Sequence, residues 1–363
     1  MSAFHRDQPY DGLPLLPPQT ELETKAVLKR TVAAHRALAD LRGMAARIPN
    51  QAILINGIVL QEARLSSEIE NIVTTHDELF RAAADPDAKA DPAAKEVLRY
   101  REALWAGFEQ LRNRPLTTNL FIELARIIKG VDLDVRAGPG TRLINPSTGQ
   151  VIYTPPQGQT LLRDKLANLE RFLYPETPDD LDPLVRMAVM HYQFEAIHPF
   201  VDGNGRTGRI LNILWLVEQG LLDIPVLYLS RYILSNRTAY YDGLRGVTED
   251  SAWESWVLYM LDAVEQTARE TCDRVRRILE LMEATRSQVQ QSAPRIYSKD
   301  LVELIFRHPY CKIQFLLDAG LAKRQTASVY LRTLSDLGLL KPLKVGREVY
   351  YLNEGLLAEL VRT

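Results

Sequence analysis

Residues 198–209 read His-Pro-Phe-Val-Asp-Gly-Asn-Gly-Arg-Thr-Gly-Arg, and this stretch decides how the rest of the chain is interpreted. Gly203, Asn204 and Gly205 tolerate the positive φ values that a tight loop requires. Successive backbone N–H groups in such a loop converge on one point and can hold an anion. The apolar spacing that follows predicts a helix over 205–219, whose free N-terminal amides add to the same site. The stretch therefore predicts a cradle for phosphate.

Charged side chains in the same stretch suggest chemistry at the bound phosphate. Arg206 and Arg209 lie three residues apart at the start of the expected helix, so both can reach one polyphosphate. Asp202 offers a hard oxygen ligand for Mg²⁺, and His198 is a proton acceptor near neutral pH. The alternative is a glycine-rich helix start with a structural histidine, but the joint occurrence of these residues favours a site.

The segments on both sides of this stretch predict a mainly α-helical chain. Residues 1–20 are rich in proline and predict an extended arm, and 82–96 predicts a loop between helices. Two short strand-like runs around Pro146-Ser-Thr-Gly149 predict a β-hairpin over 142–154. Apolar spacing predicts helices over 21–48, 50–80, 96–129, 160–175, 181–196 and, with interruptions, up to about 288.

Residues 198–209 match every defined position of HxFx(D/E)GNGRxxR, so the chain resembles the Fic family. The hairpin at 142–154, followed by Thr154-Pro-Pro, is similar to the family's flap. Asn236–Tyr241 (NRTAYY) resembles the segment that lines the adenine pocket. The resemblance covers about 115–262 and implies a helical Fic core with a β-hairpin flap.

Family membership implies transfer of AMP from ATP to Ser, Thr or Tyr hydroxyls of a target protein bound along the flap, or of the chain itself. His198 would be the base and Asp202 the Mg²⁺ ligand, while 203–205 would hold the α-phosphate and Arg206 and Arg209 the β- and γ-phosphates. The residues that the resemblance assigns to the nucleotide site are Gly203, Asn204, Gly205, Arg206, Thr207, Gly208, Arg209 and Tyr240.

Two points about these assignments stay open. Tyr240 would contact the nucleobase, but Tyr241 could exchange roles with it, or both could be core aromatics. Relatives similar to Doc, which transfer a terminal phosphate, carry Lys where this chain has Gly205, so glycine favours AMP transfer. The alternative function is a DNA-binding regulator with a nucleotide-sensing Fic-like domain, although a pure sensor would not need His198.

An upstream segment resembles the family's inhibitory pattern, [S/T]xxxE[G/N]. Ser66 and Glu70 are four residues apart on a helix expected at about 58–73, so they share one face. The resemblance implies that Glu70 pairs with Arg209 and takes space that the γ-phosphate needs. It also implies a second activity, removal of AMP with Glu70 orienting a water. The alternative is a solvated helix face.

The C-terminal segment has its own pattern. The polar stretch 287–295 predicts a domain boundary, and 296–363 shows three helices and a hairpin, the order of a winged helix-turn-helix. Residues 290–363 hold 11 Lys and Arg and 7 Asp and Glu, a net charge of +4. The segment could therefore contact DNA, or mediate protein interactions such as a homodimer. The expected domains are 1–114, a helical region with the inhibitory helix; 115–262, the Fic domain; 263–295, helix and linker; and 296–363.

The composition of the chain restricts its expected partners and cellular compartment. The net charge of −2 gives the whole chain no basic field that would draw it to nucleic acid or membrane. The two cysteines, Cys272 and Cys311, lack metal-site spacing and are too few for a disulfide framework. No apolar run has the length of a signal peptide core or a membrane span. We expect a cytoplasmic protein without a membrane partner.

Overall fold

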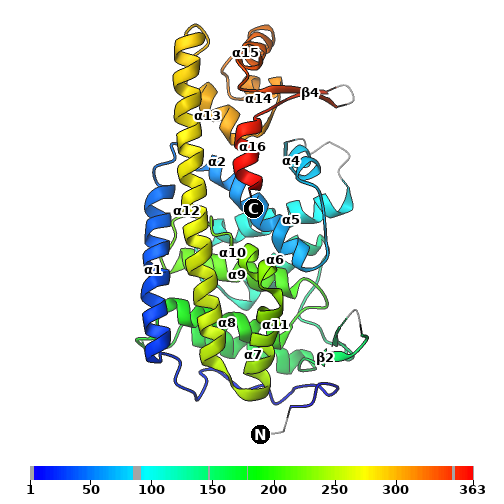
Figure 1. The fold of residues 1–363 in the computed structure, drawn as a ribbon. Helices are drawn as coiled ribbons and strands as arrows, with labels where there is room; N and C mark the ends of the chain where they lie inside the picture. Colours follow the sequence, from blue (N-terminus) through cyan, green and yellow to red (C-terminus); the bar gives the residue numbers. More distant parts are fainter. Residues whose placement is uncertain (1–3, 85–90, 146–147, 178, 346–347, 363) are drawn as a thin grey trace.

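The computed structural model describes residues 4–84, 91–145, 148–177, 179–345 and 348–362. Helices dominate this part of the chain, and two small antiparallel sheets complete it (Figure 1). No helix among the described residues is long and apolar enough to cross a membrane. The mainly helical fold class expected from the sequence is confirmed.

Two buried helices, α8 (Pro183–Ile197) and α9 (Asn204–Glu218), form the centre of the fold. Both carry apolar residues on nearly every face, which is typical of helices enclosed by others. The Asp182 side chain caps α8 by accepting the Leu184 N–H, and Pro183 occupies the first turn. The surrounding helices are α6 (Thr118–Lys129), α7 (Gln159–Leu173), α10 (Leu229–Ser235) and α11 (Arg237–Asp250).

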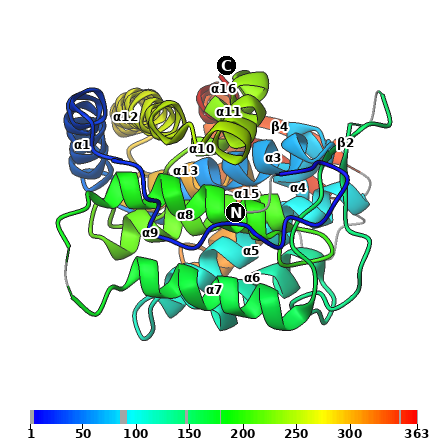
Figure 2. The same cartoon turned by 90° about the horizontal axis from the view of Figure 1, so that it is seen from below.

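The longest helix, α12 (Trp253–Ser292), runs along the whole molecule, and α1 (Lys25–Ala45) lies beside it (Figures 1 and 2). The expected domain division at 262/263 falls inside α12, which also takes in most of the helix and linker expected at 263–295. The reason is local: residues 253–292 contain neither glycine nor proline, so nothing interrupts the helix.

The N-terminal helical region is more broken than its apolar spacing suggested. Its elements are α2 (Ala52–Leu54), the π-helix η1 (Ile55–Val59), α3 (Leu60–Ile69), α4 (His76–Ala84) and α5 (Pro92–Gln110). The helix expected at 58–73 ends at Ile69, and Glu70 is its C-cap. Asn71 turns the chain at a φ of 62°, a left-handed conformation that asparagine tolerates. Residues 85–90 of the expected loop at 82–96 lie outside the described residues.

The expected hairpin is present as β1 (Leu143–Ile144) and β2 (Val151–Tyr153), which pair antiparallel. Residues 146–147 of its turn lie outside the described part of the chain. The N-terminal arm attaches to the end of this hairpin, because the Tyr10 N–H donates to the Thr154 carbonyl at 3.0 Å. Figure 2 shows the arm running across α8, where Gln193 donates to the Pro14 carbonyl at 2.9 Å.

The C-terminal domain follows the order of helices and hairpin expected for 296–363. Its elements are α13 (Lys299–Arg307), β3 (Tyr310–Cys311), α14 (Ile313–Asp318), α15 (Arg324–Asp336), β4 (Lys341–Val345), β5 (Glu348–Leu352) and α16 (Glu354–Val361). The sheet order is β3-β5-β4. The sequence did not predict β3 or α16. The last helix returns to α12, where Glu359 pairs with Arg277 at 2.6 Å.

Candidate active site

The loop between α8 and α9 is held in shape by two side chains. Asn204 closes it from within, because its side chain accepts the Phe200 N–H and donates to the Phe200 carbonyl, both at 2.8 Å. Arg136 holds it from outside through a hydrogen bond from Nε to the His198 carbonyl at 2.8 Å. Asn204 is 2% exposed. Its side chain therefore shapes the loop, and it can serve an anion only through its backbone N–H.

The first turn of α9 faces a carboxylate. Gly203 precedes the helix with a φ of 87°, a left-handed value that glycine adopts without strain. At Gly205 there is no room for a Cβ atom, because Oε1 of Glu70 lies in that space. The N-terminus of a helix carries free N–H groups and partial positive charge. Glu70 thus brings a negative group to the place where the sequence predicted phosphate.

Arg209 lies beneath Glu70 and receives contacts from the end of α3. Its side chain is 1% exposed. Nε donates to Oγ of Ser66 at 2.8 Å, and Nη2 donates to the Ser66 carbonyl at 2.9 Å and to Glu70 Oε1 at 2.8 Å. Burial alone would lower the pKa of Arg209, but the adjacent Glu70 raises it above its ordinary value. The pair expected from the sequence, Glu70 and Arg209, is therefore in contact.

Unlike Arg209, Arg206 does not pair with Glu70 but with other carboxylates. Its Nη1 lies 2.6 Å from Oε1 of Glu96 on α5, and its Nη2 lies 3.7 Å from Oδ1 of Asp202. Lys129 on α6 approaches Asp202 Oδ2 at 2.5 Å. Neither Glu96 nor Lys129 was predicted from the sequence, because both come from segments far from the motif. Thr207, also assigned to the nucleotide, is fully buried within the helical core.

Asp202 has the properties of a cation ligand. Its side chain is 62% exposed, so water and phosphate oxygens can reach it. Burial of the carboxyl works to raise its pKa, but Lys129 and Arg206 hold the pKa of Asp202 below the ordinary value. The carboxylate is therefore ionised at neutral pH. No group of three His, Cys, Asp or Glu side chains in the described part of the chain forms a metal site by itself.

His198 is placed as a neutral imidazole. It ends α8 in a left-handed conformation, with a φ of 49°. Burial, together with the charge of Arg136, lowers the pKa of His198 to about 4. Its Nδ1 is buried and has no hydrogen-bond partner among the described residues. An imidazole that is unprotonated at neutral pH can accept a proton.

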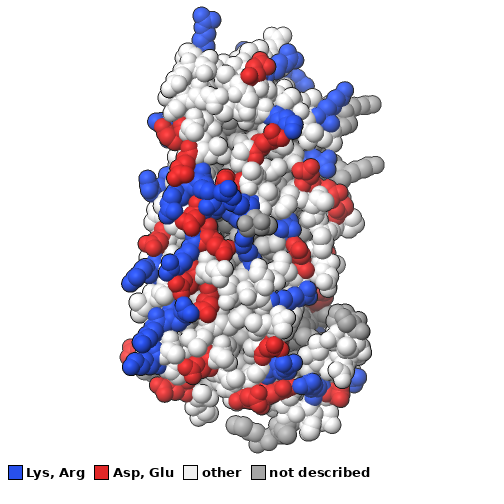
Figure 3. All heavy atoms as spheres, viewed as in Figure 1, with Lys and Arg blue, Asp and Glu red and all other residues white. Residues whose placement is uncertain are grey.

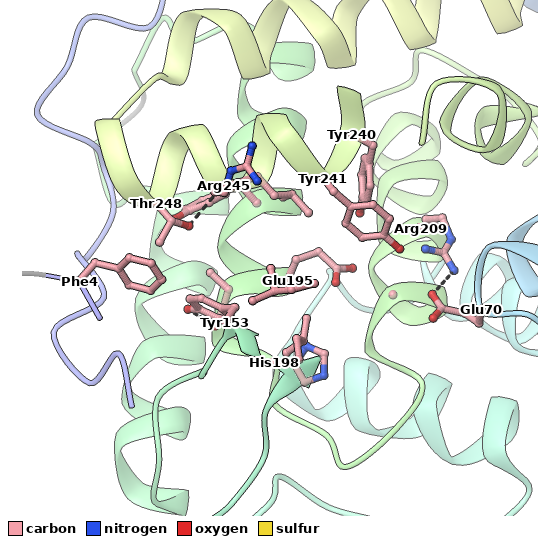
Figure 4. Close-up of a pocket in the computed structure, with 16 residues that line it drawn as sticks. Phe4, Glu70, Tyr153, Glu195, His198, Arg209, Tyr240, Tyr241, Arg245 and Thr248 are labelled. Atoms are coloured by element: carbon pink, nitrogen blue, oxygen red, sulfur yellow. Dashed lines mark hydrogen bonds and ion pairs between the residues drawn. The ribbon is translucent and has the colours of Figure 1, made fainter. Parts of the chain in front are cut away.

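A pocket extends from His198 and Arg209 toward the flap and α11 (Figure 4). Its volume is about 890 Å³, including space open to solvent. Tyr153 of β2 and Thr248 of α11 line its walls, and Phe4 of the N-terminal arm lines its far end. The ring of Phe4 stacks on Tyr153 with centroids 5.8 Å apart. The pocket is thus lined by aromatic and apolar side chains and adjoins the first turn of α9 at Gly205.

The two tyrosines that the sequence left undecided differ in position. Tyr240 is 2% exposed, and its hydroxyl forms a 2.8 Å hydrogen bond with Nε2 of His191. It also packs near Trp256 in the core. Tyr241 is 44% exposed, and Figure 4 shows it beside Arg209 at the pocket. The geometry therefore makes Tyr241 the more accessible ring, and Tyr240 mainly a core aromatic that reaches the pocket wall.

Glu195 lines the pocket but was not identified from the sequence. It lies on α8 three residues before His198, and both side chains line the pocket; this short spacing was the available signal. Its Oε1 is buried without a hydrogen-bond partner among the described residues. A Cβ atom at Gly208 would come within 2.6 Å of that oxygen, so the glycine leaves room for the carboxyl. Burial raises the pKa of Glu195 to about 7.

Comparisons with known proteins are consistent with this geometry. The curated relatives include the protein adenylyltransferase fic-1 of Caenorhabditis briggsae, 35% identical over 95 residues, which are 26% of this chain and 18% of the relative. The probable protein adenylyltransferase aq_aa38 of Aquifex aeolicus is 46% identical over 59 residues, 16% of this chain and 18% of the relative. The chain thus spans about a fifth of the length of the curated relatives it matches.

Solved structures with similar folds include a Fic family protein from Desulfovibrio desulfuricans G20, with a TM-score of 0.60 and 19% identity over 93% of this chain and 98% of the other. Residues 134–508 of Fic-1 from C. elegans give a TM-score of 0.51 and 19% identity, over 69% and 74% of the two chains. At these identities the likeness shows the fold alone.

Three family models match most of the chain in sequence order. They describe the Fic/DOC family N-terminal region at 28–109, the Fic/DOC family at 115–216, and the C-terminal domain of SoFic-like protein adenylyltransferases at 281–356. The Fic/DOC match contains the whole 198–209 motif, and the first match contains Glu70. The chain is therefore a member of the Fic/DOC family.

Proposed function

We propose that this protein is an adenylyltransferase that moves AMP from ATP to a Ser, Thr or Tyr hydroxyl of a protein. The observation that carries the proposal is the meeting of an unprotonated His198 with the first turn of α9 at one end of a pocket lined by aromatic side chains. The relatives whose names describe protein adenylyltransferases support the same activity.

The reaction follows from where the groups lie. The backbone N–H groups at the start of α9 hold the α-phosphate, and the nucleoside occupies the pocket beside Tyr241. The target hydroxyl gives its proton to His198 as its oxygen bonds to the α-phosphorus. The bond from that phosphorus to the oxygen bridging to the β-phosphate breaks, and pyrophosphate leaves. The acceptor residue keeps AMP through a phosphodiester link.

Asp202 is the residue that would hold Mg²⁺. A single ionised and exposed carboxylate suits this ion, which usually takes one or two carboxylates together with phosphates and water. When bound, Mg²⁺ neutralises charge on the leaving phosphates. In our proposal Lys129 gives up its ion pair with Asp202 as the metal binds.

Glu70 restrains the reaction in this proposal. Its carboxylate lies against Gly205 and holds Arg209, so the γ-phosphate of ATP would meet a like charge and an occupied arginine. Removal of AMP, with Glu70 orienting a water, stays a prediction that rests on the same carboxylate.

The flap and the C-terminal domain are proposed as partner sites. Ile144 and Ile152 of the hairpin are 51% and 43% exposed, which suits a target segment that adds to a strand edge. The order of elements in 296–363, with β4 and β5 as a wing, supports a winged helix. Figure 3 shows only scattered Lys and Arg over this domain on the face drawn, so DNA binding stays a prediction, as does a homodimer.

The test is to incubate the protein with ATP labelled at the α- or the γ-phosphate and follow label on protein. We expect α-label only, and more of it when Glu70 is replaced. Label from the γ-phosphate would mean transfer of a terminal phosphate instead. No label from either position, even with Glu70 replaced, would favour a nucleotide sensor and contradict the proposal.

A further inference from the structure

A cleft separates the C-terminal domain from the N-terminal helical region, far from the pocket at His198. One wall comes from η1, α4 and α5, and the other from the end of α13 and β3. Figure 1 labels α4, α5 and α13. Its volume is about 300 Å³, including space open to solvent. The side chains that meet in it include Asn56, Arg101, Arg307, His308 and Tyr310.

Among the described residues, the charged side chains that line this cleft are of one sign. The guanidinium groups of Arg101 and Arg307 form no ion pair with any carboxylate among the described residues, and Nε of Arg307 is buried without a hydrogen-bond partner there. Asp77 of α4 accepts a hydrogen bond from the Tyr310 hydroxyl. Glu102, adjacent to Arg101 along α5, is exposed.

Electrostatic effects on the same groups agree with this picture. Burial lowers the pKa of Arg101, and among the described residues the charge of Glu102 offsets this in part. Burial also lowers the pKa of His308 to about 4, and the two charges that add to the effect are Arg307 and Arg101. His308 is therefore neutral at physiological pH and can donate one ring N–H. The described side chains that line the cleft therefore offer several donors and no carboxylate.

We propose that Arg101 and Arg307 bind a small tetrahedral oxyanion of phosphate size between the two domains. Guanidinium groups bind phosphate oxygens through paired hydrogen bonds, and two of them from opposite walls can hold one ion. The narrow cleft suits a single oxyanion rather than a nucleotide. Because both arginines line the cleft and one comes from each domain, the ion would join the domains by neutralising both charges.

The site lies next to the segment that ends in Glu70. Asn56 of η1 donates to the Arg307 carbonyl at 3.2 Å, and a Cβ atom at Gly57 would come within 2.5 Å of Leu360 Cδ2 on α16. The π-helix η1 continues directly into α3, whose end carries Glu70. After Glu70, α4 returns to the C-terminal domain through Asp77 and Tyr310. An ion that tightens this junction therefore holds both flanks of the Glu70 segment in place.

The binding test uses the whole protein without nucleotide. Inorganic phosphate is titrated by calorimetry, in sodium chloride of matched ionic strength, into the parent and the double variant Arg101→Gln/Arg307→Gln. The control double variant, Arg112→Gln/Arg276→Gln, removes the same charge from side chains that are 68% and 52% exposed. We expect the cleft variant to bind phosphate at least tenfold more weakly than both others. Equal binding by all three would overturn the proposal and indicate an adventitious ion only.

Two additions keep the test decisive. If the double variant unfolds, crystals of the parent soaked in selenate give the answer, because an anomalous peak between Arg101 and Arg307 supports the site and its absence overturns it. A titration with glycerol phosphate separates the sources of the oxyanion. Weaker binding of the ester than of free phosphate supports a free ion, whereas tighter binding would overturn that assignment.

The effect on activity rests on the proposed function and has its own readout. Phosphate should lower AMP transfer by the parent at least twofold, but it should leave a Glu70→Gly variant unchanged. If phosphate inhibits the parent and the Glu70→Gly variant equally, the ion acts at the nucleotide site. That result would overturn the coupling between the cleft and the Glu70 segment. If no variant transfers AMP, the proposed function fails while the calorimetric result still stands.

Discussion

Glu70 and Arg209 are 139 residues apart in the chain, yet they share a 2.8 Å hydrogen bond in which the carboxylate is 37% exposed and the guanidinium 1% exposed. Only one partner is open to solvent, so the contact can be released by moving Glu70 and not by moving Arg209.

Replacing Glu70 by Gly should raise AMP incorporation roughly tenfold or more, equivalent to about 1.4 kcal/mol. The substitution frees Arg209 for the γ-phosphate and removes a like charge from the start of α9. The measurement is label transferred from α-labelled ATP. Glu68→Gly is the matched control, because Glu68 lies on the same helix but pairs with Arg64 at 2.8 Å. Equal stimulation by both variants would contradict the role of Glu70.

Replacing His198 by Ala in the Glu70→Gly background should reduce AMP transfer about 10²- to 10⁴-fold, the range for loss of a general base. The same background gives a pH test. The pKa of His198 is lowered to about 4, so the base stays unprotonated down to about pH 5. The acid limb of kcat/KM, which reports the free enzyme, should therefore lie near pH 4. A midpoint near 6.5 would show that the imidazole is not in the environment described.

Replacing Tyr241 by Ala should raise the KM for ATP about tenfold, since stacking of a base on an aromatic ring contributes about 1–3 kcal/mol. Replacing Tyr240 by Phe should leave KM within about twofold and lower the stability by about 1 kcal/mol, because the hydrogen bond to His191 is lost. The two variants are compared by steady-state kinetics and by denaturant unfolding. If KM for ATP rose in the Tyr240→Phe variant and not in the Tyr241→Ala variant, Tyr240 would be the nucleobase contact.

Replacing Glu195 by Gln should stabilise the fold in a pH-dependent way. Burial raises the pKa of Glu195 from 4.5 to about 7, so the folded state favours the protonated carboxyl. The stability that the protonated Glu195 carboxyl gives the wild-type fold is fully present below pH 4.5, and it is lost as pH rises through 7. The free energy of unfolding of the variant should therefore equal that of the wild type at pH 4.5. Above pH 7 it should exceed the wild-type value by up to about 3 kcal/mol.

Unfolding of the Glu195→Gln variant and the wild type is followed at several pH values. Glu109→Gln serves as the control, because this side chain is 48% exposed. A difference between Glu195→Gln and the wild type that does not change with pH would show that the carboxyl is ionised in the folded state as readily as in the unfolded one.

The part of the site that could be predicted from sequence is the part built from neighbouring residues. The loop and helix of 198–209 are specified by their own glycines and apolar spacing, and the hairpin by its turn. Glu70 was found through a resemblance, whereas its contact with Arg209 depends on how α3 packs on α9. The spacing of residues along the chain does not show that Glu70 and Arg209 are in contact.

Residues that come from distant segments could not be predicted. Glu96 on α5 and Lys129 on α6 are ordinary charged residues on amphipathic helices, and nothing in their surroundings marks them as neighbours of the motif. Asn204 shows a different limit. Its presence in the motif indicated a phosphate ligand, while both ends of its side-chain amide are used to close the loop. Residue type alone could not distinguish these two uses.

Phe4 gives the N-terminal arm a practical importance. Its ring forms the far end of the pocket and stacks on Tyr153, and the arm is tied down between Thr154 and Arg6 by a 2.6 Å hydrogen bond. An affinity tag fused ahead of residue 1, or a deletion of the first ten residues, would therefore change a wall of the binding pocket. A purification tag after residue 363 leaves this wall of the pocket unchanged. Nucleotide affinities measured with the two tag placements should therefore differ.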